Sequence, residues 1–184
     1  MATSNNIDMI TIKFNNFNGV TQEIYGKVVN DLPLYKLKCS CGLTGNLVRH
    51  GYYNRRLKAQ QGTIVLHILR VKCEVCGRTH AILPELLVPY VQLPADLQQL
   101  MLRYPLGSPE LEEVMQSNCD ITESNVLAVR SRYKRKWKER LRTLGIEIRD
   151  SIADLIQRSF SAFHRLFMQV HRGTNLADFT IHIT

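Results

Sequence analysis

The sequence predicts an α+β protein: an N-terminal, β-rich zinc ribbon, then an all-α helix-turn-helix unit, then a long C-terminal helix. Three observations support this fold class. Two short cysteine knuckles flank a stretch with the pattern of a β-hairpin. Alternating patterns give way to helical ones after a connector rich in proline. One helical segment holds most of the net positive charge.

Length and composition set the domain organisation. The chain has 184 residues, 45% of them apolar, which is enough for one large core or two small ones. We predict a zinc-ribbon domain at 1–90, a helix-turn-helix domain at 91–145, and a C-terminal helix with a tail at 146–184. No run reaches the roughly 18 to 20 apolar residues of a membrane-spanning helix, so we expect no membrane association.

Strand signals dominate the first domain. The predicted strands, in chain order, are 9–14, 24–29, 35–39, 46–57, 63–72 and 79–83. The second of these is expected to pair with the first. The fourth and fifth flank Gln60-Gln61-Gly62 and form the hairpin that leads from one knuckle to the other. Prolines at 84, 89 and 94 then mark a connector over residues 84–94.

The cysteine knuckles predict one structural zinc ion. Cys39, Cys41, Cys73 and Cys76 supply four soft ligands, and a glycine follows each pair. With every coordination position filled by protein, the ion would hold the fold together and perform no chemistry. The first pair is C-x-C, one residue shorter than usual, so two alternatives stay open. His50 or His80 replaces one thiolate, or Cys39 and Cys41 are ordinary strand residues.

The N-terminal residues contain no basic and apolar export signal, so we expect reduced thiols and a cytoplasmic, nucleoid-associated protein. The fifth cysteine, Cys119, lies in a different segment and is expected to be a small buried apolar residue.

Three helical patterns follow the connector. The first covers 95–104, and the second begins after Ser108, an N-cap with proline next to it, and ends near residue 117. The third begins at Asp120 or Thr122. Its apolar stripe has spacings of three and four and consists of Val126, Val129, Tyr133, Trp137, Leu141 and Leu144. A short helix, a tight turn and a longer helix predict a helix-turn-helix.

The third helix is strongly basic. The chain carries a net charge of +8, and residues 130–142 hold eight basic residues against Glu139 alone. Such density favours binding to phosphate backbones, and exposed asparagine and arginine can pair with base edges. We therefore expect binding to double-stranded DNA. The candidate nucleic-acid-binding residues are Arg55, Arg56, Ser124, Asn125, Arg130, Arg132, Lys134, Arg135, Lys136 and Lys138.

A long helix is predicted at 146–172, with a broad apolar face. That face either packs within the chain or forms a homodimer suited to palindromic DNA. The segment 178–183 has a strand-like pattern.

The order of motifs resembles a known group of proteins. It runs from Cys39-x-Cys41-Gly42 through His50-Gly51-Tyr52-Tyr53 to Cys73-x-x-Cys76-Gly77-Arg78-Thr79-His80 and Leu83-Pro84. Over roughly 35–140 it resembles small zinc-ribbon proteins encoded near bacterial mobile elements. It is also similar to the N-terminal zinc-finger and helix-turn-helix region of insertion-sequence transposases. The resemblance implies zinc at the four cysteines and DNA binding at a terminal repeat or operator. Because about 40 residues follow the helix-turn-helix, we expect no transposase catalytic domain.

The sequence therefore predicts a sequence-specific DNA-binding protein without enzymatic activity, either a transcriptional regulator or a mobile-element accessory factor. No nucleophile motif, paired-carboxylate site or phosphate-binding glycine loop is present. Two alternatives belong to other classes. One is an adaptor that joins a larger nucleoprotein complex, such as a polymerase, recombinase or nuclease machine. The other is an RNA-binding module in which Tyr52, Tyr53 and Arg55 contact bases and phosphates.

Overall fold

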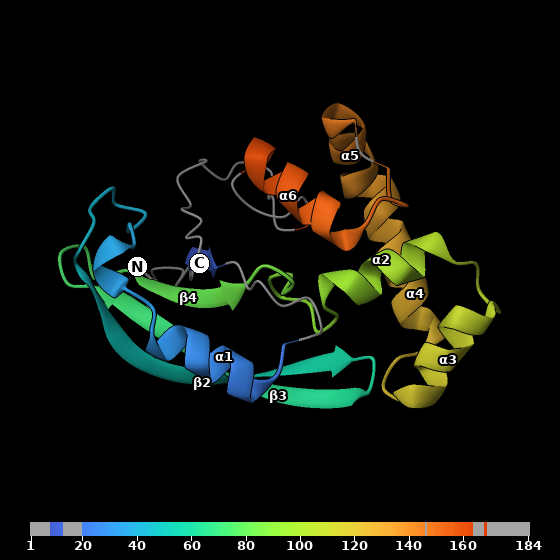
Figure 1. The fold of residues 1–184 in the computed structure, drawn as a ribbon, viewed down its shortest axis with the longest axis horizontal. Coiled ribbons are helices and arrows are strands. Elements are labelled where there is room, and N and C mark those ends of the chain that lie inside the picture. The colour runs from blue at the N-terminus through green and yellow to red at the C-terminus, as the bar shows by residue number, and fades with distance from the viewer. Residues whose placement is uncertain (1–7, 13–19, 146, 164–167, 169–184) are drawn as a thin grey trace, which may run out of the picture.

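The computed structural model describes residues 8–12, 20–145, 147–163 and 168. It has a mixed α+β architecture, as the sequence predicts. A four-stranded sheet has the order β1-β4-β3-β2; the helix at Gln22–Asn30 lies along this sheet, and most of the other helices lie toward one end of it (Figure 1). Of the helices that the structure describes, none has the length and hydrophobicity needed to cross a lipid bilayer.

The sheet is built on a long hairpin. Its strands are β2 (Leu47–Ala59) and β3 (Gly62–Cys73), joined by the predicted turn at 59–62. The strand β4 (Thr79–Pro84) pairs antiparallel with the C-terminal end of β3, and β1 (Asp8–Ile12) pairs parallel with β4. The prediction that segment 24–29 pairs with the first strand is therefore wrong.

Segment 24–29 belongs instead to helix α1 (Gln22–Asn30). The hydroxyl of Thr21 caps its N-terminus by accepting a hydrogen bond from the Ile24 N–H. Tyr25 and Val29, four residues apart, share one buried face. The β-branched residues favoured a strand on propensity alone, and the cap with the helical spacing overrides them. Segment 35–39 is likewise not a regular strand, because a 3-10 turn occupies Leu34–Lys36.

Tyr25 joins α1 to the point where β3 and β4 separate. Its hydroxyl donates to the Ile82 carbonyl oxygen at 2.9 Å and accepts from the Leu69 N–H at 2.8 Å. Two strand groups that have no strand partner there are thereby satisfied. Burial raises the pKa of this hydroxyl well above its usual value.

The helical part follows the connector. It contains α2 (Ala95–Arg103), α3 (Pro109–Ser117), α4 (Glu123–Arg132), α5 (Lys138–Leu144) and α6 (Ile152–Phe163). The predicted cap at Ser108 is confirmed, and of the two caps considered for the third helix, Asp120 and Thr122, the structure has Thr122. The predicted helix 146–172 is shorter at its start, because residues 148–150 form a turn. Its predicted end and the strand-like segment 178–183 lie outside the described residues.

A five-residue π-helical turn, Tyr133–Trp137, joins α4 to α5. In a regular α-helix at about 100° per residue, Leu141 would point roughly 120° away from Val129. One extra residue in a wider turn removes most of that rotation. Val129, Trp137 and Leu141 are consequently all buried on the side that faces the helical core.

Two hydrophobic clusters form the core. The sheet cluster contains Tyr25, Leu37, Leu66 and Ile82 among others. The helical cluster contains Met101, Val126 and Trp137, together with the α6 residues Leu155, Ile156 and Phe160. The described apolar face of α6 therefore packs within the chain, which is one of the two arrangements that the sequence left open.

Candidate metal centre and nucleic-acid interface

Two turns bring the cysteines together. In the first, the Cys39 N–H donates to the Leu43 carbonyl oxygen at 2.8 Å, and the chain reverses at Gly42 with φ of 95°. In the second, the Gly77 N–H donates to the Cys73 carbonyl oxygen at 2.9 Å. The Glu74 N–H donates to the carbonyl oxygen of Asn46, just before β2, at 2.9 Å. This bond ties the second turn to the start of the hairpin.

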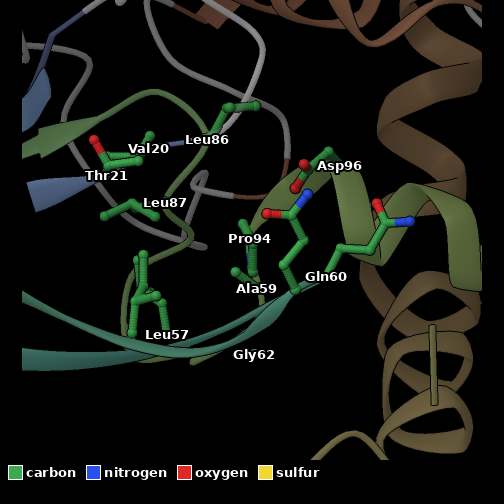
Figure 2. A pocket seen from close by; sticks show the side chains of 12 residues that line it. Val20, Thr21, Leu57, Ala59, Gln60, Gly62, Leu86, Leu87, Pro94 and Asp96 are labelled. Atoms are coloured by element: carbon green, nitrogen blue, oxygen red, sulfur yellow. The ribbon is translucent and has the colours of Figure 1, made fainter. Parts of the chain in front are cut away.

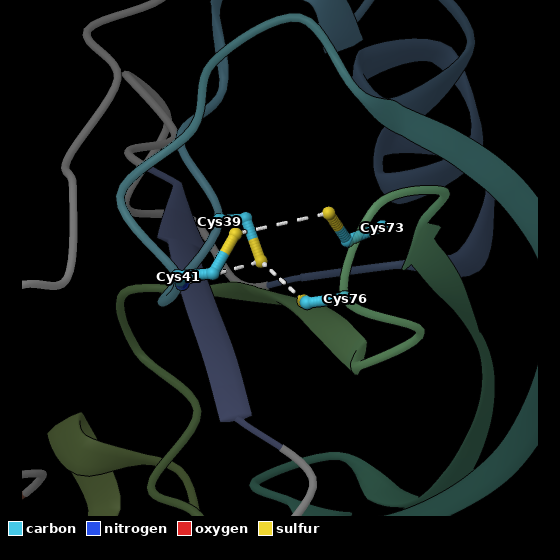
Figure 3. Close-up of side chains that lie close together, drawn as sticks. All are labelled: Cys39, Cys41, Cys73 and Cys76. Atoms are coloured by element: carbon cyan, nitrogen blue, oxygen red, sulfur yellow. Dashed lines mark hydrogen bonds between the residues drawn. The ribbon is translucent and has the colours of Figure 1, made fainter.

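The four thiols face one another across a small space (Figure 3). The sulfur of Cys39 lies 3.5 Å from that of Cys76, and the sulfur of Cys41 lies 3.9 Å from that of Cys73. All four sulfur atoms lie within 4.8 Å of one another. Four thiolates around one tetrahedral ion at about 2.3 Å would stand about 3.8 Å apart. The donor set and its spacing therefore fit a single metal ion.

Each turn contributes one buried and one exposed thiol. Cys39 and Cys73 are buried, whereas Cys41 and Cys76 are exposed. Burial raises the pKa of the Cys39 thiol to about 12. Backbone N–H groups of Cys76 and Val75 stabilise the thiolate of Cys73 and lower its pKa to about 7. Because metals bind thiolates, a cation would have to displace the proton of Cys39.

The two histidines considered as ligands have different positions. His80 on β4 is buried, and its Nε2 lies 3.2 Å from the Cys39 sulfur. It therefore contacts the thiol cluster from outside. His50 is exposed, at a bulge where the β2–β3 register shifts between Arg49 and Tyr52. Cys119 is also exposed, so the prediction that it is buried is wrong. Its turn follows α3 at the surface, which its sequence pattern did not indicate.

The basic segment divides into cations with a structural partner and cations that face solvent. Arg130 donates from Nε to the Met101 carbonyl oxygen at the end of α2, at 3.1 Å. Arg132 lies over the Trp137 ring at 5.7 Å, and partial burial lowers its pKa. Four predicted residues are exposed on the π-helical turn and the start of α5: Lys134, Arg135, Lys136 and Lys138. Of these, Arg135 also donates from Nε to the Ser131 carbonyl oxygen at 3.4 Å.

The N-terminal turn of α4 holds two candidates, and both side chains have hydrogen-bond partners. Ser124 is exposed, and its hydroxyl shares a 2.7 Å hydrogen bond with that of Thr122. The Asn125 side-chain oxygen accepts from the Thr122 N–H at 3.1 Å and from Lys58 Nζ at 3.2 Å. Leu127, which sequence reasoning missed, is 55% exposed on the same helix. Its place on the side opposite Val126 and Val129 could have been found from the helical period.

The tip of the hairpin docks on the turn between α3 and α4. Lys58 Nζ donates to the Asp120 carbonyl oxygen, and the Thr63 hydroxyl donates to the Asp120 carboxylate, both at 2.5 Å. The Asn118 side-chain amide donates to the Ala59 carbonyl oxygen at 2.8 Å. Together with the bond from Lys58 to Asn125, these contacts hold the hairpin tip against the turn before α4. The basic helix therefore has a defined position relative to the sheet.

The two candidate arginines on β2 also differ. Arg56 is exposed, whereas Arg55 is half-buried and donates to the carbonyl oxygens of Val88 and Val91 at 2.6 and 2.8 Å. Burial lowers the pKa of Arg55. Its guanidinium therefore braces the connector in this structure.

A cavity of about 450 Å³ lies where the hairpin tip, the connector and the start of α2 meet (Figure 2). Leu57, Leu86 and Leu87 form apolar walls, and Gln60 and Asp96 stand on the side nearer α2. Burial raises the pKa of Asp96. With one carboxylate and no basic side chain among its described lining residues, this cavity does not favour an anion.

Comparison with known proteins gives one family match. A family model described as a domain of unknown function (DUF6431) matches residues 38–116. The matched range begins just before the first cysteine turn and ends in α3, so α4 and α5 lie beyond it. No curated protein and no solved structure matches the chain.

Proposed function

We propose that this chain is a zinc-stabilised, sequence-specific DNA-binding protein that acts as a transcriptional regulator or as an accessory factor of a mobile element. The observation that supports the proposal best is the exposed surface formed by α4, the π-helical turn and α5. It combines solvent-facing cations with small polar and apolar side chains, and a docked hairpin holds it in place.

The cations suit phosphate contacts. Lys134, Arg135, Lys136 and Lys138 are exposed within five consecutive positions. Glu139, the acidic residue that follows Lys138, forms an ion pair with Arg142 at 2.7 Å. Side chains without strong structural partners can reorient toward a phosphate backbone at little cost, and the counterions released from DNA then favour binding.

Three exposed, uncharged side chains suit contacts to bases. Ser124, Leu127 and Ala128 are exposed on α4, ahead of the cations in the chain. A hydroxyl can bond to base edges in a major groove, and an apolar side chain can contact the thymine methyl group. In this proposal α3, its turn and α4 act as a helix-turn-helix, with α4 as the recognition helix.

Zinc is the metal that we propose for the cysteine cluster. Four thiolates in a closed tetrahedral set are typical of structural zinc, although iron also accepts such a set. The ion would fix both cysteine turns and thereby the base of the hairpin. The hairpin tip in turn holds the α3–α4 turn through Lys58 and Thr63. Metal content measured on purified protein tests the identity of the ion.

The central experiment is the salt dependence of binding to duplex DNA. Random duplex pools would first yield a preferred sequence, and fluorescence anisotropy would then follow affinity across ionic strengths. Replacing Lys134 and Lys136 with glutamine should flatten the log–log salt slope by about 0.9 per lost phosphate contact. The matched control is Lys36→Gln and Lys72→Gln, because both lysines are exposed on the sheet part.

Two results would contradict the proposal. One is weak duplex binding that does not change with salt. The other is an equal loss of affinity in the control variant, which would mean that net charge rather than the α4–α5 surface governs binding.

A further inference from the structure

The connector contains a tyrosine in a backbone conformation that favours glycine. The Val91 N–H donates to the Val88 carbonyl oxygen at 3.2 Å and closes a four-residue turn. Pro89 is its second residue and Tyr90 its third, with φ of 61°. Tyr90 is the one described non-glycine residue with positive φ. This pattern belongs to type II turns, whose third position normally takes glycine or asparagine.

Tyr90 is also the most exposed large hydrophobic residue among the described residues. Tyr90 is 75% exposed. A bulky residue with positive φ costs stability, and such residues persist where the surrounding structure holds them. In this conformation most of the Tyr90 surface is open to solvent. The conformation therefore points to a role in contacting something outside the chain.

Arg55 holds this turn at both ends. Its guanidinium donates to the Val88 carbonyl oxygen at 2.6 Å and to the Val91 carbonyl oxygen at 2.8 Å. These are the first and last residues of the turn. Half-burial of Arg55 reduces competition from water, so the two charge-assisted bonds strengthen the turn. Tyr90 is thereby presented from a rigid position.

The turn forms one wall of a separate cavity of about 310 Å³. Tyr53 and Tyr90 line it with aromatic residues, Gln92 with an amide and Arg55 with a cation, whereas Asn54 and Arg56 alternate with Tyr53 and Arg55 along β2 and border the cavity at its rim. No described lining residue is acidic. The volume is at the small end of the roughly 300 to 1,000 Å³ of ligand sites. Its size and chemistry suit one planar heterocycle next to an anion.

We propose that this cavity binds a single unpaired nucleobase of a nucleic-acid strand. Tyr90 stacks on the base, the Gln92 amide contacts its edge, and the long, exposed Arg56 side chain meets the adjoining phosphate at the rim. Aromatic stacking with a nearby cation is the usual chemistry of single-strand recognition. The inference rests on nucleic-acid binding in general, but it does not need the duplex contacts proposed for α4 and α5.

The cavity adjoins the docked hairpin tip. The Lys58 N–H donates to the Gln92 carbonyl oxygen at 2.9 Å, so the connector runs along the outer edge of β2. Lys58 also bonds to Asn125 on α4. Arg56 is two residues from Lys58, about 7 Å along the strand. A strand end leaving a duplex held by α4 could therefore reach the cavity.

The test compares two DNA probes that differ in one feature. One is a short blunt duplex, and the other is the same duplex with a single-stranded overhang containing the fluorescent base 2-aminopurine. The wild-type chain should bind the overhang probe about tenfold more tightly, the size expected from one base–aromatic stack. Stacking should also quench 2-aminopurine. A ribonucleotide overhang shows whether RNA or DNA is preferred.

Tyr90→Gly is the informative variant because it relieves the positive φ. Its melting temperature should stay unchanged or rise, whereas the preference for the overhang and the quenching should disappear. Tyr90→Phe should retain both. The control is Tyr35→Ala, since Tyr35 is 66% exposed and does not line the cavity.

The inference is overturned if Tyr90→Gly keeps the overhang preference, or if the control loses it equally. An equal loss on the blunt duplex would also overturn it. If the wild-type chain binds the overhang but not the blunt duplex, the proposed duplex function fails and this inference stands. If it binds neither probe, both proposals fail.

Discussion

The sheet part and the helical part are stabilised by different kinds of contact. In the sheet part, β1 pairs with β4, about seventy positions later in the chain, and the cysteine turns meet across the whole hairpin. In the helical part, successive helices from α2 to α6 share one cluster. Long-range contacts require costly loop closure, whereas neighbouring helices do not. The comparison indicates why the cysteine cluster lies in the sheet part.

Loss of the proposed zinc ion should have the largest effect, and it should be confined to the sheet part. Binding of a structural zinc ion is worth about 10 to 16 kcal/mol in small domains. Cys73→Ser, or treatment with a chelator, should abolish the β-sheet signal in circular dichroism and leave much of the helical signal. Cys119→Ser is the control because Cys119 is exposed outside the cluster. Full retention of structure without metal would refute the assignment.

Trp137→Ala should have the converse effect. The side chain is 3% exposed in the helical cluster, so its removal should cost about 3 to 5 kcal/mol. Helical content and duplex binding should fall, while the metal stoichiometry stays at the wild-type value. Denaturant unfolding with parallel metal analysis measures both. Simultaneous loss of metal would mean that the two parts do not fold separately.

Tyr25→Phe should weaken the sheet part by less. It leaves the Leu69 N–H and the Ile82 carbonyl oxygen without the hydroxyl, in a buried place. The expected loss is about 1 to 3 kcal/mol. Hydrogen exchange at Leu69 should accelerate, whereas amides in α3 and α4 should keep their protection. Equal acceleration in both parts would show that stability is shared throughout the chain.

The smallest effect concerns the junction. Lys58→Met with Thr63→Val removes the hairpin-tip bonds to Asp120. Each exposed or half-buried bond of this kind contributes about 1 kcal/mol. We expect nearly unchanged stability of each part but less coupled unfolding, seen as a broader or two-step melting curve. A single sharp transition at the wild-type temperature would indicate that apolar packing alone couples the parts.

Local signals predicted most of the fold. The hairpin, β4 and the starts of α2, α3 and α4 follow from alternation, turn residues and caps such as Ser108. The parallel pairing of β1 with β4 could not be predicted, because nothing in either strand specifies so distant a partner. For segment 24–29, propensity favoured a strand, and the Thr21 cap was the signal that could have corrected it.

The candidate site divides in the same way. The spacing of the cysteines was enough to predict that four thiols gather. Charge density identified the basic helix, but composition could not separate exposed Lys134 from Arg130, which is bonded to the end of α2. Arg55 shows the same difficulty, because its partners lie on a connector more than thirty residues away. The role of Tyr90 depends on a backbone angle that residue type alone does not reveal.

The π-helical turn at Tyr133–Trp137 separates two requirements that a regular helix would link. The core requires a fixed register for Trp137 and Leu141, whereas the outer surface can vary in the number of residues it presents. The wider turn holds one extra residue, which adds one side chain to the exposed surface and leaves the buried side chains in register. Deletion of Lys136 should therefore convert the segment to a plain α-helix, shorten the basic surface by one position and preserve the core. Helices of this kind can change length one residue at a time.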